Sequence, residues 1–308
     1  MAVQTPMPEM PIIRPPSEWR SLLVRVTRGC RWNRCRFCGI YPHLGAPEFS
    51  VRTVDEVKRD IDLLRRLRPR AETAFLGDAD PLEAGVDAFL EIARYLRRAV
   101  SVRRLTCYAR AATLHKLKRQ AIMDLAAAGL DRVHIGLESG SDAILRFHRK
   151  GQSADMVRQV ADWLHEAGIE ISFYVLLGLG GANQWQQHIR ETARVINDTA
   201  PHFVRIRRLW LYDNGSGMPD SECPLWQQIR AGDFVPQTDE GTVHELRLLV
   251  SLLAAGDTFF ACDHENNFVQ VSGVLKQDRE EMLAEIDAFL SLPAEARQVH
   301  YQEVGSRI

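Results

Sequence analysis

Long apolar runs and an excess of one charge sign are both missing from this sequence of 308 residues. No stretch approaches the roughly 20 consecutive apolar residues that a membrane-spanning helix requires. The first 16 residues are rich in proline and lack the apolar core of a secretory signal peptide. These absences predict a protein of the reducing cytoplasm without a membrane partner.

Neither sign of charge dominates, because 39 Lys and Arg stand against 40 Asp and Glu, for a net charge of −1. A large nucleic-acid surface needs clustered cations that release counterions from phosphates. Short arginine runs do occur at residues 65–68 and 205–208. We interpret the first run as a solvated helix end, where cations suit the helix dipole. The composition argues against a bulk nucleic-acid surface and leaves a local basic patch open.

Cysteine is scarce and unevenly placed, with three of the six residues inside the segment 30–38. This is not the pattern of a disulfide-rich secreted domain. Cys30, Cys35 and Cys38 place three thiolates on one short loop, where they can converge on one metal centre. The next cysteine is Cys107.

The missing fourth ligand separates the candidate metal sites. A closed zinc site needs four ligands, and electron-carrying iron–sulfur clusters normally have four cysteines. His43 could complete a Cys3His zinc site. Alternatively, three cysteines leave one iron of a cluster open, as an open position marks catalytic metals. The remaining thiols are expected to be buried small hydrophobes rather than a second cluster; they are Cys107, Cys223 and Cys262.

Short strand-like runs alternate with apolar residues at helical spacing through residues 19–210. This alternation predicts parallel βα units, and six of them favour an α/β fold, a partial (β/α)6 TIM-like barrel. Residues 1–18 are expected to form a surface tail, and residues 211–308 a C-terminal loop and helical extension that closes the barrel. The expected strands are 22–27, 74–76, 105–110, 133–138, 171–177 and 203–209.

Polar residues follow the second predicted strand, at the edge where barrel enzymes carry their chemistry. Gly77 permits a sharp turn, and exposed carbonyls together with Asp78 or Asp80 can hold an ammonium group. The alternative is an ordinary turn in which one of these aspartates caps a helix.

Glu138 ends the fourth predicted strand and shares a strand face with His134 and Gly136. An unpaired carboxylate inside a barrel costs several kcal/mol. Glu138 is therefore expected to meet either a ligand or an arginine. We expect His134 to satisfy a hydrogen bond of the core rather than to bind a metal.

Three further groups are candidates. Arg205 and Arg207 share one face of the sixth predicted strand, so they either bind an anionic ligand or pair with Glu138 or Asp80. Asp263 and His264 follow an apolar strand and are suited to acid–base work or to a turn with capping side chains. The glycine-rich residues 178–181 allow close approach of a ligand or form a tight turn.

The cysteine spacing, with Phe37 as the aromatic residue before the last cysteine, resembles the signature of the radical S-adenosylmethionine (radical SAM) superfamily. The resemblance implies a [4Fe–4S] cluster on Cys30, Cys35 and Cys38, with S-adenosyl-L-methionine (SAM) on the open iron. It further implies reductive cleavage of SAM to a 5′-deoxyadenosyl radical that acts on an unidentified substrate. Most members have three residues between the first two cysteines, and this chain has four.

The same resemblance assigns roles to the polar candidates. Gly77, Asp78 and Asp80 stand where the superfamily binds the SAM amino group, and Glu138 where it meets the ribose hydroxyls. It also implies an electron donor such as flavodoxin or ferredoxin. A small-molecule substrate is expected, because we see no appended RNA-binding or peptide-recognition domain. Two other classes remain open, a zinc-containing binding module and an iron–sulfur electron-transfer protein.

Overall fold

The structure is a computed structural model that describes residues 7–10, 12–43, 48–211, 223–254 and 256–305. The chain folds into two compact units. Unit 1 holds residues 1–33, 44–135 and 162–171, and unit 2 holds residues 34–43, 136–161 and 172–308.

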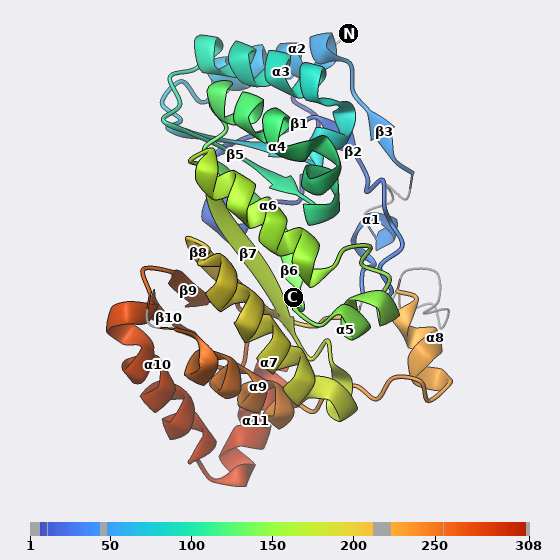
Figure 1. Cartoon of the computed structure of the whole chain (residues 1–308), viewed down its shortest axis with the longest axis vertical. Helices are drawn as coiled ribbons and strands as arrows, with labels where there is room; N and C mark the ends of the chain where they lie inside the picture. The colour runs from blue at the N-terminus through green and yellow to red at the C-terminus, as the bar shows by residue number, and fades with distance from the viewer. Residues whose placement is uncertain (1–6, 11, 44–47, 212–222, 255, 306–308) are drawn as a thin grey trace, which may run out of the picture. The chain divides into compact units, whose positions relative to one another are not determined.

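Strands and helices alternate along most of the chain (Figure 1). The strands are β1 (Leu22–Arg25), β2 (Thr27–Arg28), β3 (Ser50–Val51), β4 (Thr73–Gly77), β5 (Arg104–Ala109), β6 (Arg132–Glu138), β7 (Glu170–Leu177), β8 (Phe203–Arg208), β9 (Phe259–Cys262) and β10 (Val271–Val274). The helices are η1 (Pro16–Glu18), α1 (Ile40–His43), α2 (Val54–Leu67), η2 (Pro81–Ala84), α3 (Val86–Ala99), α4 (Ala111–Ala127), α5 (Asp142–Phe147), α6 (Ala154–Glu166), α7 (Gly181–Thr199), α8 (Leu225–Arg230), α9 (Asp239–Leu252), α10 (Leu275–Leu290) and α11 (Ala294–Gly305). The main sheet has the strand order β1-β4-β5-β6-β7-β8-β9-β10, and β2 pairs with β3.

Unit 1 is built on parallel strands, as the sequence predicted. β4 pairs in parallel with β1 and with β5, and β5 pairs in parallel with β6. The spacing of Thr53 and Glu56 in the sequence is that of a capping box, and helix α2 begins with one, in which the two residues satisfy each other's backbone N–H groups. Helices α2 and α3 pack side by side (Figure 1). His134 makes the expected core hydrogen bond, with its Nε2 3.2 Å from Glu18 Oε1.

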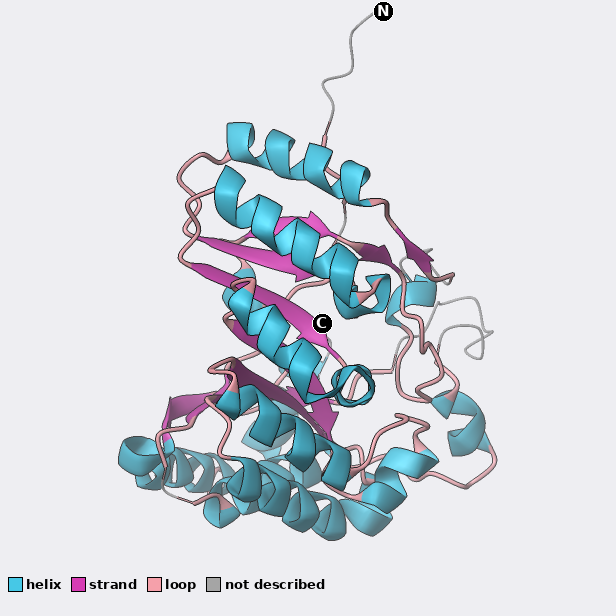
Figure 2. Cartoon of the chain, turned by 45° about the horizontal axis from the view of Figure 1, so that its top comes forward, coloured by secondary structure: helices cyan, strands magenta, loops and turns pink. Residues whose placement is uncertain are grey.

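Unit 2 continues with parallel strands and ends on a hairpin. β8 lies between β7 and β9 and is parallel to both, whereas β10 is antiparallel to β9. Helix α9 packs against α7 and α10. Each of the three helices has a buried apolar face, which includes Leu249 on α9, Ile189 on α7 and Ile286 on α10. Figure 2 shows these helices in cyan against the magenta strands of the unit.

Three features differ from the expectation. Ile12 and Glu18 are buried, so the proline-rich segment is not simply a surface tail. The glycines and prolines of residues 212–238 predict a loop-rich stretch, yet residues 225–230 form helix α8; residues 212–222 lie outside the described part. The short edge strand β10 was also missed, because Ser272 and Gly273 interrupt its apolar pattern.

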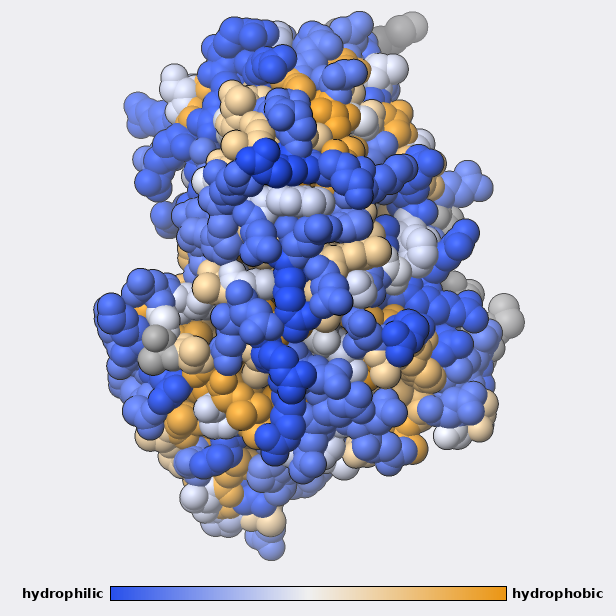
Figure 3. All heavy atoms as spheres, viewed as in Figure 1, coloured by the Kyte–Doolittle hydropathy of each residue, from blue (hydrophilic) through white to orange (hydrophobic). Residues whose placement is uncertain are grey.

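None of the described helices is long and apolar enough to cross a membrane. The face in Figure 3 is covered largely by hydrophilic residues, with hydrophobic residues exposed in separate groups.

Candidate functional site

The cysteine loop runs between β2 and α1 without regular secondary structure. Cys30, Cys35 and Cys38 are free thiols and half-buried. The backbone N–H of Asn33 donates to Cys30 Sγ at 3.4 Å, and hydrogen bonds to cluster sulfurs are one way in which a protein tunes an iron–sulfur site. Among the described side chains, no group of three or more His, Cys, Asp or Glu is arranged to hold a metal ion. Cys30 belongs to unit 1 and the other two cysteines to unit 2.

The first half of the loop is anchored within unit 1 at the ends of β4 and β5. Arg31 Nε lies 3.4 Å from Glu83 Oε2, in the helix that follows β4. The Arg110 guanidinium, at the end of β5, lies 4.6 Å from the centre of the Trp32 ring. The residues between the first two cysteines are therefore held by an ion pair and a cation–π contact.

The second half of the loop is clamped within unit 2 through the backbone of Arg36. Its N–H donates to the His148 carbonyl at 3.0 Å, and its carbonyl accepts from the Leu225 N–H at 2.7 Å and from the Cys223 thiol at 3.3 Å. The next residue, Phe37, packs edge-on against the His148 ring, with centroids 5.6 Å apart. Segments far apart in the sequence thus fix the two residues between Cys35 and Cys38.

The acidic turn after β4 is occupied by contacts within unit 1. Asp80 is buried, caps η2 by accepting from the Leu82 N–H at 3.2 Å, and accepts from the Arg110 N–H at 3.0 Å. Burial raises the pKa of Asp80 to about 6, although hydrogen bonds from Thr113 and from the Arg110 backbone oppose the rise. Asp78 lies 2.9 Å from the Arg25 guanidinium. Asp80 thus caps a helix, as the alternative interpretation held, and binding of the SAM amino group at Gly77, Asp78 and Asp80 stays a prediction.

Glu138 ends β6 with a partner that sequence patterns did not identify. Lys150 Nζ lies 2.8 Å from Glu138 Oε1, and both side chains are about nine-tenths buried, with exposed fractions of 10% and 12%. Glu138 has a φ of 61°, in the left-handed region. A Cβ added at Gly136 would lie 2.2 Å from Glu138 Oε1 and 2.7 Å from Lys150 Nζ. Glycine at this position therefore leaves room for the pair, and Gly136 and Glu138 share a face as predicted.

Helix α7 holds the turn that follows Glu138. His188 Nδ1 lies 2.8 Å from Ser139 Oγ, and its Nε2 lies 2.9 Å from the Leu176 carbonyl. The Gly140 N–H donates to Thr192 Oγ1 at 2.8 Å. Burial lowers the pKa of His188 to about 4, so the ring is neutral near pH 7. No local sequence pattern indicates this link, because 49 residues separate His188 from Ser139.

The glycine turn after β7 is bound to a buried carboxylate of α9. The Gly178 N–H donates to Glu245 Oε2 at 2.6 Å, and Gln237 Nε2 donates to the other carboxylate oxygen at 3.0 Å. Burial raises the pKa of Glu245 to about 7, although both hydrogen bonds oppose the rise. Residues 178–181 form a tight turn, and a ligand role for it stays a prediction.

The predicted arginines lie on β8, near the turn that carries Asp263 and His264. Among the described residues, Arg205 and Arg207 form no ion pair with a carboxylate, so the proposed pairing with Glu138 is not seen. His264 Nδ1 lies 2.7 Å from Asn266 Oδ1 within its own turn. Burial and the nearby charge of Arg207 lower the pKa of His264. His264 therefore makes the capping contact of the alternative interpretation, and catalytic roles for Asp263 and His264 stay predictions.

Residues 24–195 match the model of the Radical SAM superfamily, which covers more than half of the chain. The protein belongs to the radical SAM superfamily. It is a radical SAM enzyme, and its cofactors are a [4Fe–4S] cluster and SAM.

Two curated radical SAM relatives align with part of the chain. The tRNA-2-methylthio-N(6)-dimethylallyladenosine synthase of Syntrophobacter fumaroxidans (strain DSM 10017 / MPOB) is 27% identical over 227 residues, which are 67% of this chain and 46% of that protein. The 4'-phospho-dehydrooxetanocin synthase of Priestia megaterium is 26% identical over 173 residues, which are 49% of this chain and 23% of that protein. The chain thus spans less than half the length of these relatives.

Solved structures of the superfamily share the fold. Coproporphyrinogen III oxidase (HemN) of Escherichia coli superposes with a TM-score of 0.55 at 12% identity, over 75% of this chain and 51% of that chain. Methylornithine synthase (PylB) superposes with a TM-score of 0.50 at 15% identity, over 92% of this chain and 85% of that chain. The prediction of an α/β, partial TIM-like barrel is confirmed.

Burial separates the described thiols into two chemically different sets. Cys107, Cys223 and Cys262 are buried, and burial raises the pKa of each thiol. Metal ligation requires thiolates, which such burial disfavours. Cys30, Cys35 and Cys38 are accessible and lie on an irregular loop, so their donor set suits three irons of a cluster.

Proposed function

We propose that Cys30, Cys35 and Cys38 are the cluster ligands of this radical SAM enzyme. The observation that carries the proposal is the separation of the six thiols into three half-buried ones on one loop and three buried ones elsewhere. The anchoring of Trp32 and the clamp on Arg36 support it, because a loop fixed at both halves holds its thiols with little entropic cost of ordering.

We propose that Glu138, oriented by Lys150, contacts SAM. The ion pair engages Oε1 of the carboxylate and leaves its second oxygen, Oε2, as an acceptor for a hydroxyl group. The Lys150 ammonium also lies 5.9 Å from the centre of the Phe37 ring. This contact connects the end of β6 to the segment between Cys35 and Cys38, all within unit 2.

Held by Cys30, Cys35 and Cys38, a reduced [4Fe–4S] cluster would supply the electron for cleavage of SAM to a 5′-deoxyadenosyl radical, which would remove hydrogen from a substrate. The chain's own residues orient and support this chemistry. His188 and Thr192 fix the turn behind Glu138, and the backbone of Arg36 is fixed by hydrogen bonds on both sides. Such support decides whether reacting groups stay within the narrow geometry that a reaction requires.

We propose a small-molecule substrate and a small electron-carrier protein, flavodoxin or ferredoxin, as reductant. The balanced net charge of −1 supports the first assignment over a large nucleic acid. The relative from Priestia megaterium is named for a small phosphorylated product, and that from Syntrophobacter fumaroxidans for a tRNA. A tRNA substrate is therefore the second candidate.

The testing experiment is anaerobic. The protein is reconstituted with iron and sulfide, reduced with dithionite and given SAM, and 5′-deoxyadenosine is measured by mass spectrometry. We expect its formation to require all three loop cysteines. Zinc as the bound metal, or an intact cluster without SAM cleavage under any tested substrate pool, would overturn the proposal. Small-molecule extract and total tRNA, added separately, show which pool increases turnover.

A further inference from the structure

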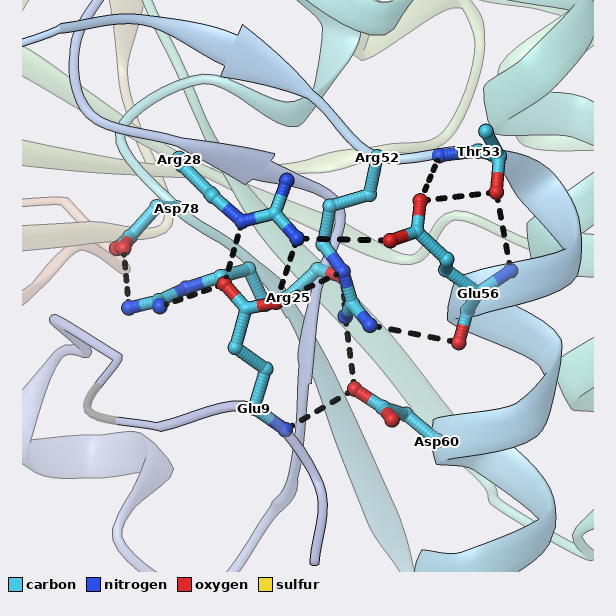
Figure 4. A network of polar contacts seen from close by, with 8 residues as sticks. All are labelled: Glu9, Arg25, Arg28, Arg52, Thr53, Glu56, Asp60 and Asp78. Carbon is cyan, nitrogen blue, oxygen red and sulfur yellow. Dashed lines mark hydrogen bonds and ion pairs between the residues drawn. The ribbon is translucent and has the colours of Figure 1, made fainter.

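Three arginines of unit 1 converge on one carboxylate, that of Glu9 (Figure 4). Arg28 Nε and Nη2 each lie 2.7 Å from a different oxygen of Glu9, which is the bidentate arrangement of a strong pair. Arg25 Nη1 lies 3.0 Å from Glu9 Oε1, and Arg52 Nε lies 3.2 Å from Glu9 Oε2. One carboxylate thus receives contacts from three guanidinium groups.

All three arginines also contact other groups, and Arg28 Nη2 lies 3.6 Å from Glu56 Oε1. Arg52 Nη1 lies 2.7 Å from Asp60 Oδ2 and 2.9 Å from the Arg25 carbonyl. Arg25 Nη2 lies 2.9 Å from Asp78 Oδ2. The Arg52 and Arg25 side chains are only 5% and 11% exposed. Their orientation toward the Glu9 position therefore does not depend on Glu9 alone.

Glu9, by contrast, lies between exposed residues, ahead of the buried Ile12. Its neighbours Met7 and Met10 are 70% and 51% exposed. Its backbone N–H donates to Asp60 Oδ2 at 3.1 Å, and further along the segment the Ile13 N–H donates to Asp78 Oδ1 at 3.2 Å. Burial would raise the pKa of Glu9, but the hydrogen bonds from Arg28 and Arg25 and the charge of Arg52 lower it to about 2. The occupant is thus a full anion at neutral pH.

We propose that Arg25, Arg28 and Arg52 form an oxyanion-binding site that Glu9 occupies in cis, and that a phosphate or carboxylate group of a ligand can take its place. Guanidinium groups in this arrangement suit either oxyanion, because each presents paired donors to two oxygens. Arg28 precedes Cys30 by two residues. The occupant of the site therefore acts on the start of the cysteine loop, and the N-terminal segment is a latch that an anionic ligand releases.

The test uses the full chain with Glu9→Ala, which empties the site while leaving the three arginines. Inorganic phosphate and acetate are titrated separately, with ionic strength held constant by chloride, and Tm is recorded. We expect a saturable rise of several degrees in Glu9→Ala and a much smaller response in the wild type, since a ligand that binds only the folded state stabilises it. The double variant Glu9→Ala, Arg28→Ala should lose the rise. The anion that saturates at the lower concentration identifies phosphate or carboxylate as the preferred group.

Hydrogen exchange gives an independent measure of the latch. The amides of Glu9 and Ile13 should exchange faster in Glu9→Ala, and phosphate should accelerate them in the wild type. If Glu9→Ala does not fold, Glu9→Gln keeps the side-chain volume and serves for both measurements. A Tm response to phosphate and acetate no greater than that of the wild type would show a permanent structural ion pair and overturn the proposal. Unchanged exchange at both amides would overturn the latch.

Discussion

Lys150 Nζ lies 2.8 Å from Glu138 Oε1 and pairs with the residue that ends β6. Lys150 follows helix α5 and the left-handed residue Arg149, whose φ is 53°. Gln152, two residues on, donates to the carbonyls of Gly136 and Leu137 at 3.0 and 3.2 Å. The segment after α5 therefore supports both the side chain and the backbone at the end of β6.

Replacing Glu138 with glutamine should weaken SAM binding while leaving the iron content unchanged. Hydrogen bonds to charged groups contribute about 1.5–3 kcal/mol, which corresponds to a loss of roughly tenfold to a hundredfold in affinity. Equilibrium dialysis of the reconstituted protein with labelled SAM measures the change. Glu280→Gln, an exposed carboxylate on α10, is the matched control. Normal SAM affinity in Glu138→Gln would remove this residue from the site.

Lys150→Met should show a related but distinct effect. It removes the counter-charge and leaves a largely buried carboxylate without its ion pair, which is a destabilising change. We expect both a lower urea midpoint and weaker SAM binding, and Glu138→Gln in the same chain should recover part of the stability. A double-mutant cycle over the two positions gives their coupling energy. Additive effects on unfolding would contradict the pairing.

Cys35→Ala should lose most of the iron after anaerobic reconstitution, because two thiolates cannot hold three irons of the cluster. Cys107→Ala should retain it, since that thiol is buried in β5. Iron and sulfide analysis, with the visible absorbance of the cluster, compares the two variants. Full iron in Cys35→Ala would refute its assignment as a ligand.

Gly140→Ala should destabilise the fold through a backbone clash. A Cβ at this position would lie 2.3 Å from the Glu191 carbonyl oxygen of α7. Overpacking of this kind costs roughly 1–3 kcal/mol, so Tm should fall by several degrees. Gly256→Ala is the control, because no atom lies within 4 Å of the added Cβ there. Equal Tm values for the two variants would show that α7 does not pack on this turn.

Glu245 should make stability depend on pH. Its pKa is raised by burial to about 7, so the folded state holds a proton that the unfolded state has released between about pH 4.5 and 7. The contribution of Glu245 to the free energy of unfolding is therefore fully present below pH 4.5 and is lost as the pH rises to 7. The free energy of unfolding falls by no more than about 1.4 kcal/mol per pH unit on this account. Urea unfolding of wild type and Glu245→Gln across this range measures it. The variant should gain stability relative to wild type as pH rises, and a constant difference would contradict the assignment.

Local patterns in the sequence predicted much of the fold. The capping box at Thr53 and the first strand, predicted at residues 22–27 and observed as Leu22–Arg25, both depend on neighbouring residues. The shared face of Gly136 and Glu138 follows from the two-residue period of a strand. The match to the superfamily then confirmed the fold class.

Long-range partners were not predictable in the same way. His188 and Glu245 lie on helices 49 and 67 residues away from their partners Ser139 and Gly178, and Lys150 lies 12 residues after Glu138. The clamp on Arg36 uses backbone groups, which carry no sequence signal. Ile12 and Glu18 are buried by distant parts of the chain, whereas proline content alone indicated a surface tail.

The unequal burial of the six thiols also provides an internal standard for cluster assembly. Thiolates react with alkylating reagents far faster than buried thiols of raised pKa, so Cys107, Cys223 and Cys262 should label slowly in every preparation. Mass spectrometry of briefly alkylated protein then counts the loop thiols that remain unprotected. The same spectrum separates empty, partly assembled and filled molecules, which bulk iron analysis averages together.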